Sequence, residues 1–215
     1  MTLRRSPDNT HQVMENRQMR TIEELHIMLA NGLPADAEAG QRLFQEACLH
    51  VRNGMAARRR EHDKAKSQAA KAKATGNGKA KVDTRQPDDT AQNFFRRGAY
   101  LLIRSYLTTG REAVIQKLVT DCGNQSPRRP TFQDNPFHWG LLAMYSDRSR
   151  LSKERRRLYA HQMLYAHRHD VPEHFLIGFI HQLGRTDRIY GKVANDEREA
   201  WFKAGTSTKH GKSRL

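Results

Sequence analysis

The sequence predicts an all-α protein with a helical bundle-type architecture in two parts, joined by a basic flexible linker. Apolar residues recur three and four positions apart, as on one face of a helix, whereas the alternation typical of strands is scarce. Hydrophobic residues make up 37% of the 215 positions, which is enough to fill a modest core. The predicted segments are an N-terminal helical pair with a basic extension (1–73), a glycine-containing linker (74–89), a C-terminal helical domain (90–205) and a basic tail (206–215).

The N-terminal part begins its first predicted helix at a capping box, in which Thr21 and Glu24 satisfy each other's backbone amides. We expect this helix to end at Asn31 and Gly32, and a second helix to begin near Ala35. The apolar face of the second helix consists of Leu43, Phe44, Ala47 and Val51. Because no stop signal follows, we expect this helix to run into the basic residues beyond its packed part.

The C-terminal part opens with Asp89 or Thr90 as the N-cap of a helix whose apolar residues step by four, three and four positions. These core-facing residues are Phe95, Ala99, Leu102 and Tyr106. Gly110 allows a turn into a further helix. The residues expected to be buried there are Val114, Ile115 and Leu118. Asn135 and Pro136 then begin another helix, as its N-cap and first residue.

Further helices are predicted toward the C-terminus. One spans residues 152–168 and is capped by Ser152, and the next spans residues 171–184 and is capped by Asp170. A short helix over residues 195–203 follows, anchored by its aromatic residues. These helices complete the predicted C-terminal domain.

Clustered positive charge is the strongest functional signal in the chain. Lys and Arg number 38 against 23 Asp and Glu, and nine basic residues fall within residues 55–82 beside only Glu61 and Asp63. Charge of one sign attracts polyanions with an affinity that falls with salt, so we predict a nucleic-acid-binding arm. Its composition would allow disorder in the free state, and the alternative is a solvated linker. The predicted contacts are Arg58, Arg59, Arg60, Lys64, Lys66, Lys71 and Lys73.

A second basic group overlaps the predicted helix 152–168. It comprises Arg148, Arg150, Lys153, Arg155, Arg156, Arg157 and Arg168. Arginine makes forked contacts to phosphate and to guanine, so we interpret this group as nucleic-acid contacts. Tyr159 and Tyr165 lie on the same helix and could stack on exposed bases, but we interpret them as core residues.

Residues 162–183 fit a helix-turn-helix template, which would present the second helix to a major groove. The motif would be degenerate, because Asp170 replaces the usual turn glycine and Phe175 and Ile177 occupy positions that are normally polar. A simple pair of packed helices explains the same pattern. If the motif holds, the groove-facing residues are His174, Gly178, His181 and Arg185.

Two other functional hypotheses stay open. Arg156 and His161 have a spacing that resembles the Rx4H active site of HEPN ribonucleases, and the resemblance implies that they would act on RNA phosphates. Arg157 stands where that family commonly has an amide or hydroxyl side chain. The other hypothesis is an RNA-binding or protein-binding subunit of a larger nucleoprotein assembly, in which helix 171–184 and the helix of Trp139 face protein partners.

Other classes find no support in the sequence. Five histidines lie between His161 and His181, but their spacing fits no zinc motif, so we predict no metal and no cofactor. No apolar run is long enough to cross a membrane, and Cys48 and Cys122 are too few for a disulfide framework. We therefore predict a cytoplasmic nucleic-acid-binding protein with no catalytic residues and no catalysis by this chain alone. DNA is favoured over RNA, because the helix-turn-helix-like segment can read a duplex and no RNA-binding signature is evident. A protein partner or homo-oligomer also stays open.

Overall fold

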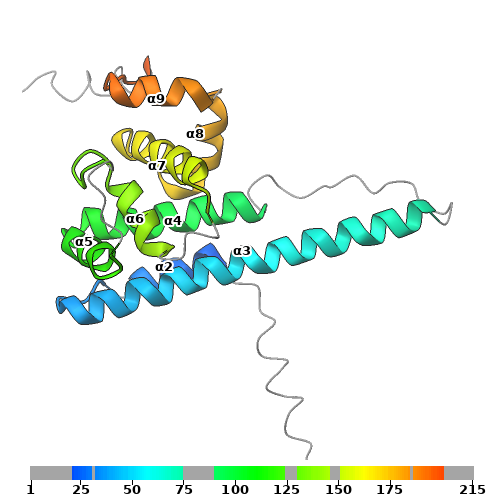
Figure 1. The fold of residues 1–215 in the computed structure, drawn as a ribbon, viewed down its shortest axis with the longest axis horizontal. Helices are drawn as coiled ribbons and strands as arrows, with labels where there is room; N and C mark the ends of the chain where they lie inside the picture. Colours follow the sequence, from blue (N-terminus) through cyan, green and yellow to red (C-terminus); the bar gives the residue numbers. More distant parts are fainter. Residues whose placement is uncertain are drawn as a thin grey trace, which may run out of the picture.

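The computed structural model describes residues 21–30, 32–74, 90–123, 130–145, 151–184 and 186–200. Every regular element within these ranges is a helix, which confirms the all-α prediction (Figure 1). The elements in chain order are α2 (Ile22–Ala30), α3 (Ala37–Ala74), α4 (Ala91–Thr108), α5 (Glu112–Asp121), α6 (Pro136–Met144), α7 (Lys153–Arg168), the 3-10 helix η3 (Glu173–Phe175), α8 (Leu176–Gln182) and α9 (Thr186–Ala194).

Short polar side chains begin the helices where the sequence predicts. The hydroxyl of Thr21 accepts a hydrogen bond from the Glu24 amide at 3.1 Å, and the Glu24 carboxylate accepts one from the Thr21 amide at 3.2 Å. This reciprocal pair is the predicted capping box. Thr90, Asn135 and Ser152 cap α4, α6 and α7 in the same way, each accepting from the amide three residues further on.

Asp170 does not cap a helix, contrary to the prediction. It follows the end of α7 with a φ of 52°, and the amides of Asp170 and Val171 donate to the carbonyl oxygens of His167 and Ala166. These bonds close α7 with a left-handed turn. The predicted helix 171–184 therefore begins later, as η3, and continues as the seven-residue α8.

The C-terminal elements also differ from the prediction. Helix α9 was not predicted, and the first five residues of the predicted helix 195–203 are not helical. The Tyr165 hydroxyl donates to the Glu199 carboxylate at 2.8 Å, and the Glu199 amide donates to Nε2 of His169 at 3.0 Å. These tertiary bonds hold the segment against α7. The predicted tail 206–215 lies outside the described residues.

A shared core joins the two predicted parts. Phe44 in α3 packs edge-on against Tyr106 in α4 with ring centroids 5.1 Å apart, and the Tyr106 hydroxyl donates to the carbonyl oxygen of Gly40 at 2.7 Å. Gly98 in α4 lies so close to α3 that a Cβ there would sit 2.8 Å from a methyl carbon of Val51. Buried residues of both parts form one hydrophobic cluster, so the two-part arrangement is not confirmed. Apart from its first residue, the predicted linker lies outside the described part of the chain.

Helix α4 is the centre of the packing. It lies between α3 and α7, with α8 and α9 further from α3 (Figure 1). Tyr100 of α4 stacks on Phe137 of α6 with centroids 5.6 Å apart, and its hydroxyl donates to the carbonyl oxygen of Val171 at 2.7 Å. One buried side chain thus ties α4 to α6 and to the segment that precedes α8.

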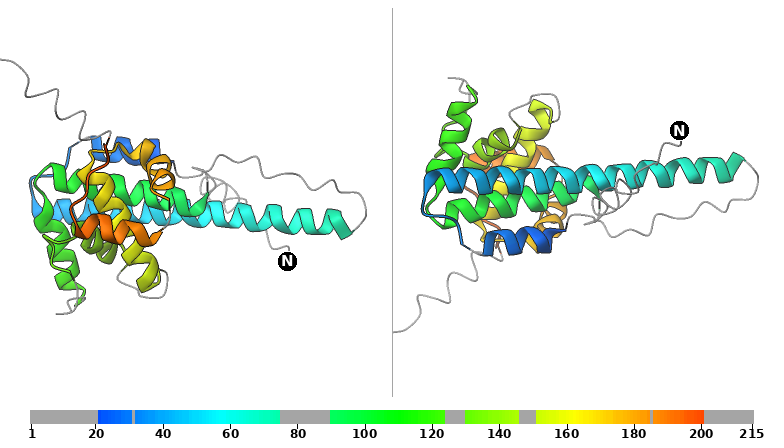
Figure 2. Two further views of the ribbon diagram at one scale, coloured as in Figure 1. Left: turned by 90° about the horizontal axis from the view of Figure 1, so that it is seen from above. Right: turned by 90° about the horizontal axis from the view of Figure 1, so that it is seen from below.

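Helix α3 is longer than the body that it packs against. Its first part contributes buried residues up to Gly54, whereas all the residues from 59 to 71 are exposed. Two further views show the same segment standing clear of the other helices (Figure 2). We call residues 59–74 the α3 extension; sixteen residues of helix span roughly 24 Å. The expectation that this helix continues past its packed part is confirmed.

Candidate nucleic-acid interface

The candidate interface begins where α3 leaves the helical body. The guanidinium carbon of Arg58 lies 3.7 Å from the ring centroid of Phe94, and Arg58 Nη1 donates to the carbonyl oxygen of Gly54 at 3.3 Å. Phe94 is buried in the first turn of α4. The cation–π contact therefore fixes the base of the α3 extension against the start of α4.

Two more arginines lie over aromatic rings at this end of the body. The guanidinium carbon of Arg96 in α4 is 4.3 Å from the ring centroid of Tyr159 in α7, and that of Arg52 in α3 is 5.4 Å from the ring centroid of Tyr145. Phe95 packs between the two tyrosines, with centroid distances of 5.5 Å and 6.2 Å. These cation–π contacts hold the two guanidinium groups against the body, and Arg96 Nη1 also donates to Oδ1 of Asn93 at 3.3 Å.

The start of α7 adds cations to this end of the molecule. Lys153, Arg155 and Arg157 are exposed, and the guanidinium carbon of Arg157 lies 4.8 Å from the ring centroid of Tyr190. Arg156 is different, because only 8% of it is exposed. The basic run on α7 therefore presents three cations to solvent and turns Arg156 into the body.

Other predicted contacts have different surroundings. Arg168 lies 3.2 Å from the Asp196 carboxylate and donates to the carbonyl oxygen of Val193 at 2.9 Å, so its charge helps to hold the end of α9 against α7. His174 and His181 are exposed on η3 and α8. Arg148, Arg150 and Arg185 lie outside the described residues, as does the side chain of Lys73.

The exposed α3 extension carries five of the predicted contacts whose side chains the structure describes. Its described cations are Arg59, Arg60, Lys64, Lys66 and Lys71. The acidic residues on the same segment are Glu61 and Asp63, and the Asp63 carboxylate lies 3.6 Å from Nδ1 of His62. The structure brings the extension, the start of α4 and the start of α7 together through the Arg58 and Arg96 contacts.

Comparison with protein-family models, with curated proteins and with solved structures found no match for this chain.

The helix-turn-helix-like segment consists of a tight turn after α7 and the short helix α8. Asp170 adopts the left-handed conformation that a turn glycine would take. Helix α8 has only seven residues, Ile177 is buried within it, and Phe175 is 61% exposed just before it. A pair of packed helices describes this segment, and its use in DNA reading stays a prediction.

The pair proposed by the HEPN resemblance lies on α7. Arg156 is buried, and Nδ1 of His161 donates to the carbonyl oxygen of Arg157 at 2.8 Å. The His161 ring packs edge-on against Tyr190 with centroids 4.7 Å apart, and burial lowers the pKa of His161. Packing explains the placement of the His161 ring, and a catalytic role for this residue stays a prediction.

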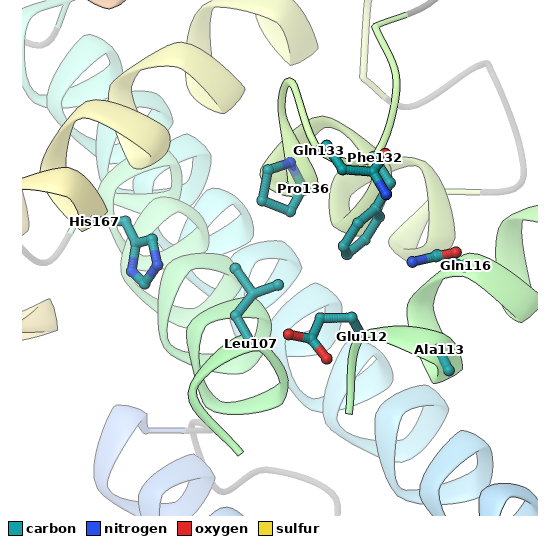
Figure 3. Close-up of a pocket in the computed structure, with 8 residues that line it drawn as sticks. All are labelled: Leu107, Glu112, Ala113, Gln116, Phe132, Gln133, Pro136 and His167. Atoms are coloured by element: carbon teal, nitrogen blue, oxygen red, sulfur yellow. The ribbon is translucent and has the colours of Figure 1, made fainter. Parts of the chain in front are cut away.

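An open pocket lies at the other end of α4. Its volume is about 550 Å³, and Leu107, Glu112 and His167 are among the residues that line it. In the view of Figure 3, Leu107 lies between the Glu112 carboxylate and the His167 ring. Within the described residues we find no cluster of three metal-ligating side chains and no helix long and apolar enough to cross a membrane.

Sequence reasoning missed Arg52 and Arg96, which stand among the arginines held over aromatic rings. Both lie outside the dense basic runs, so a search for clustered charge does not identify them. The signal for Arg96 is its position in the segment Phe-Phe-Arg-Arg at the start of a predicted helix. Arg52 has no comparable local signal, because its partner Tyr145 is distant in sequence.

Proposed function

We propose that this chain binds nucleic acid without catalysing a reaction, with DNA as the preferred partner. The observation that carries the proposal is the convergence of three cationic helix segments at one end of the body. The stacking of Arg58 on Phe94 joins the α3 extension to α4, and that of Arg96 on Tyr159 joins α4 to α7. Cations on adjoining segments act together on a polyanion and raise its local concentration.

The number of exposed cations sets the expected salt dependence. The extension and the start of α7 together expose eight described cations, which are Arg59, Arg60, Lys64, Lys66, Lys71, Lys153, Arg155 and Arg157. If each meets one phosphate, the slope of log affinity against log salt is about −7 for a duplex. A fourfold rise in salt then weakens binding by about 10⁴-fold. Neutralisation by Glu61, Asp63 and Glu154 would make the slope shallower.

The α3 extension is unsuited to an anionic membrane surface. Membrane-surface helices bury a face of large apolar side chains in the lipid. Between residues 59 and 71 the uncharged residues other than His62 are alanine, serine and glutamine. Charge without an apolar face favours a ligand that is itself a line of negative charges, such as nucleic acid.

Fluorescence anisotropy of the whole chain with labelled duplex DNA, single-stranded DNA and duplex RNA tests the proposal. Each titration is made at about 50 mM and about 200 mM salt, because affinity without a salt dependence does not identify phosphate contacts. We expect the tightest binding to duplex DNA and a steep loss of affinity at the higher salt. An acidic polypeptide such as polyglutamate serves as the non-nucleic control.

The outcomes distinguish nucleic-acid binding from the alternative functions. Equal affinity for polyglutamate and for nucleic acid would show that the charge serves acidic proteins and would overturn the proposal. Tighter binding to RNA than to duplex DNA would favour a subunit of a nucleoprotein assembly. Absence of binding at both salt concentrations would reject nucleic acid as the ligand.

A further inference from the structure

The cations of the α3 extension form two rows along the helix. Successive residues of an α-helix are about 100° apart around the axis, so residues seven apart lie within about 20° of one another. Arg59 and Lys66 form one row at this spacing, and Arg60, Lys64 and Lys71 form the other. The centres of the two rows are about 130° apart on the helix surface.

A strip of small side chains lies between the two rows. Asp63, Ser67, Ala70 and Ala74 are spaced by four, three and four residues and fall within about 60° of one another. All four are exposed. Ala65 lies on the opposite side of the helix from this strip. We call the four residues the small face.

No part of the described body covers the small face. Every described side chain of the extension is exposed, and the segment projects beyond the other helices in all three views (Figures 1 and 2). Helical segments with neither an apolar stripe nor packing partners gain little from tertiary contacts. The alanines supply the helix propensity that the segment needs.

We propose that the α3 extension lies in the major groove of B-form duplex DNA, with the small face toward the base edges and the two cation rows toward the two phosphate backbones. This inference rests on the proposed nucleic-acid binding and names its ligand. The major groove is about 12 Å wide, which matches the diameter of a helix, roughly 10–12 Å. The extension covers about seven base pairs at about 3.4 Å each.

The chemistry of the small face suits base edges. Alanine makes apolar contact with the thymine methyl group, serine bonds to either donors or acceptors, and a carboxylate accepts from the amino group of cytosine. Ala70, Ser67 and Asp63 place these three groups in one strip. Small side chains also let the backbone approach the bases, which keeps the flanking cations within reach of phosphates.

Duplex RNA and single strands do not fit this arrangement. The major groove of A-form RNA is too deep and narrow for side chains to read, and a single strand has no groove. The extension would still attract both by charge, with an affinity that depends on salt and not on which side of the helix is altered. A difference between substitutions on opposite sides of the helix therefore distinguishes groove binding from simple charge attraction.

The test uses a matched pair of variants, Ala70→Glu in the small face and Ala65→Glu on the opposite side. Both positions are exposed in the same helical segment, and both changes alter the net charge equally. We expect Ala70→Glu to weaken binding to duplex DNA about tenfold more than Ala65→Glu, a difference comparable to that of a mismatched base pair. On single-stranded DNA the two variants should weaken binding equally. Circular dichroism confirms that both keep their helix content.

A second readout reports the groove directly. Dimethyl sulfate methylates guanine N7, which lies in the major groove, so the bound wild-type chain should protect guanines over about seven base pairs. Equal effects of the two variants on duplex DNA, together with unprotected N7, would overturn the groove inference while leaving nucleic-acid binding intact. Failure of the wild-type chain to bind any nucleic acid would instead reject the proposed function itself.

Discussion

Replacing Arg60 and Lys64 by alanine tests the phosphate contacts that we propose for the α3 extension. The two cations are four residues apart on one exposed row, where like charges repel each other. Alanine has the highest helix propensity, so the double variant should keep the extension helical or stabilise it. Any loss of binding then reports charge and not unfolding.

The expected size follows from counterion release. Each phosphate contact contributes about 0.9 to the slope of log affinity against log salt for B-DNA, so loss of two contacts makes the slope shallower by about 1.8. If only the counterion-release contribution to binding changes, affinity at about 0.1 M salt falls about 60-fold, which is a loss of about 2.5 kcal/mol in binding free energy. The loss should shrink as salt rises.

Anisotropy titrations at several salt concentrations supply the slope. The control is the double variant Arg42→Ala and Lys117→Ala, which removes the same charge from exposed positions elsewhere on α3 and on α5. We expect the control to keep nearly the full slope. Equal slope changes in the two double variants would refute the reasoning, because binding would then follow net charge and not the position of the extension.

Three further predictions address the rest of the molecule. Replacing Arg155 and Arg157 by alanine should also make the slope shallower by about 1.8, and an unchanged slope would remove α7 from the interface. Burial lowers the pKa values of His161, His167 and His169 in the folded chain, whereas histidines in the unfolded chain take up protons below about pH 6.5. Because the unfolded chain then binds more protons, the free energy of unfolding should fall as pH decreases from about 7.5 to 5.5. Urea unfolding at the two pH values measures this change, and a pH-independent midpoint would contradict it. Gly98→Ala should lower the free energy of unfolding by about 1–3 kcal/mol, because its Cβ would meet Val51 in α3. Adding Val51→Ala should cost less in that background than in the wild type, and strictly additive effects would contradict the close α3–α4 packing.

Local signals account for the parts of the fold that sequence predicts well. The Thr21 box, the Thr90 cap and the Ser152 cap each join residues three positions apart, so the chemistry is complete within one turn. The long α3 is predictable for a related reason, since no proline follows its apolar face within the helix. The starts of these helices and the length of α3 can therefore be predicted from local sequence alone.

Tertiary contacts decide the features that sequence misplaces. Asp170 carries a cap-forming side chain, but the end of α7 uses it in a left-handed turn. Arg156 belongs to a run of arginines, yet its position on α7 turns it into the body. Arg52 lies over an aromatic ring only because Tyr145, the residue that follows α6, packs close to α3. Charge runs predict which segments are basic, whereas helix phase and packing decide which cations reach a ligand.

The continuity of α3 gives an independent reason to expect a stiff ligand. The close approach of Gly98 to Val51 and the stacking of Arg58 on Phe94 fix the rotation of α3 about its own axis. The directions of the two cation rows are therefore set relative to the body and to the exposed cations of α7, without a disordered arm having to fold first. Preorganisation of this kind strengthens binding most when the ligand also holds its charges in a fixed geometry. A duplex does so, whereas a flexible single strand must lose conformational entropy to match the same rows.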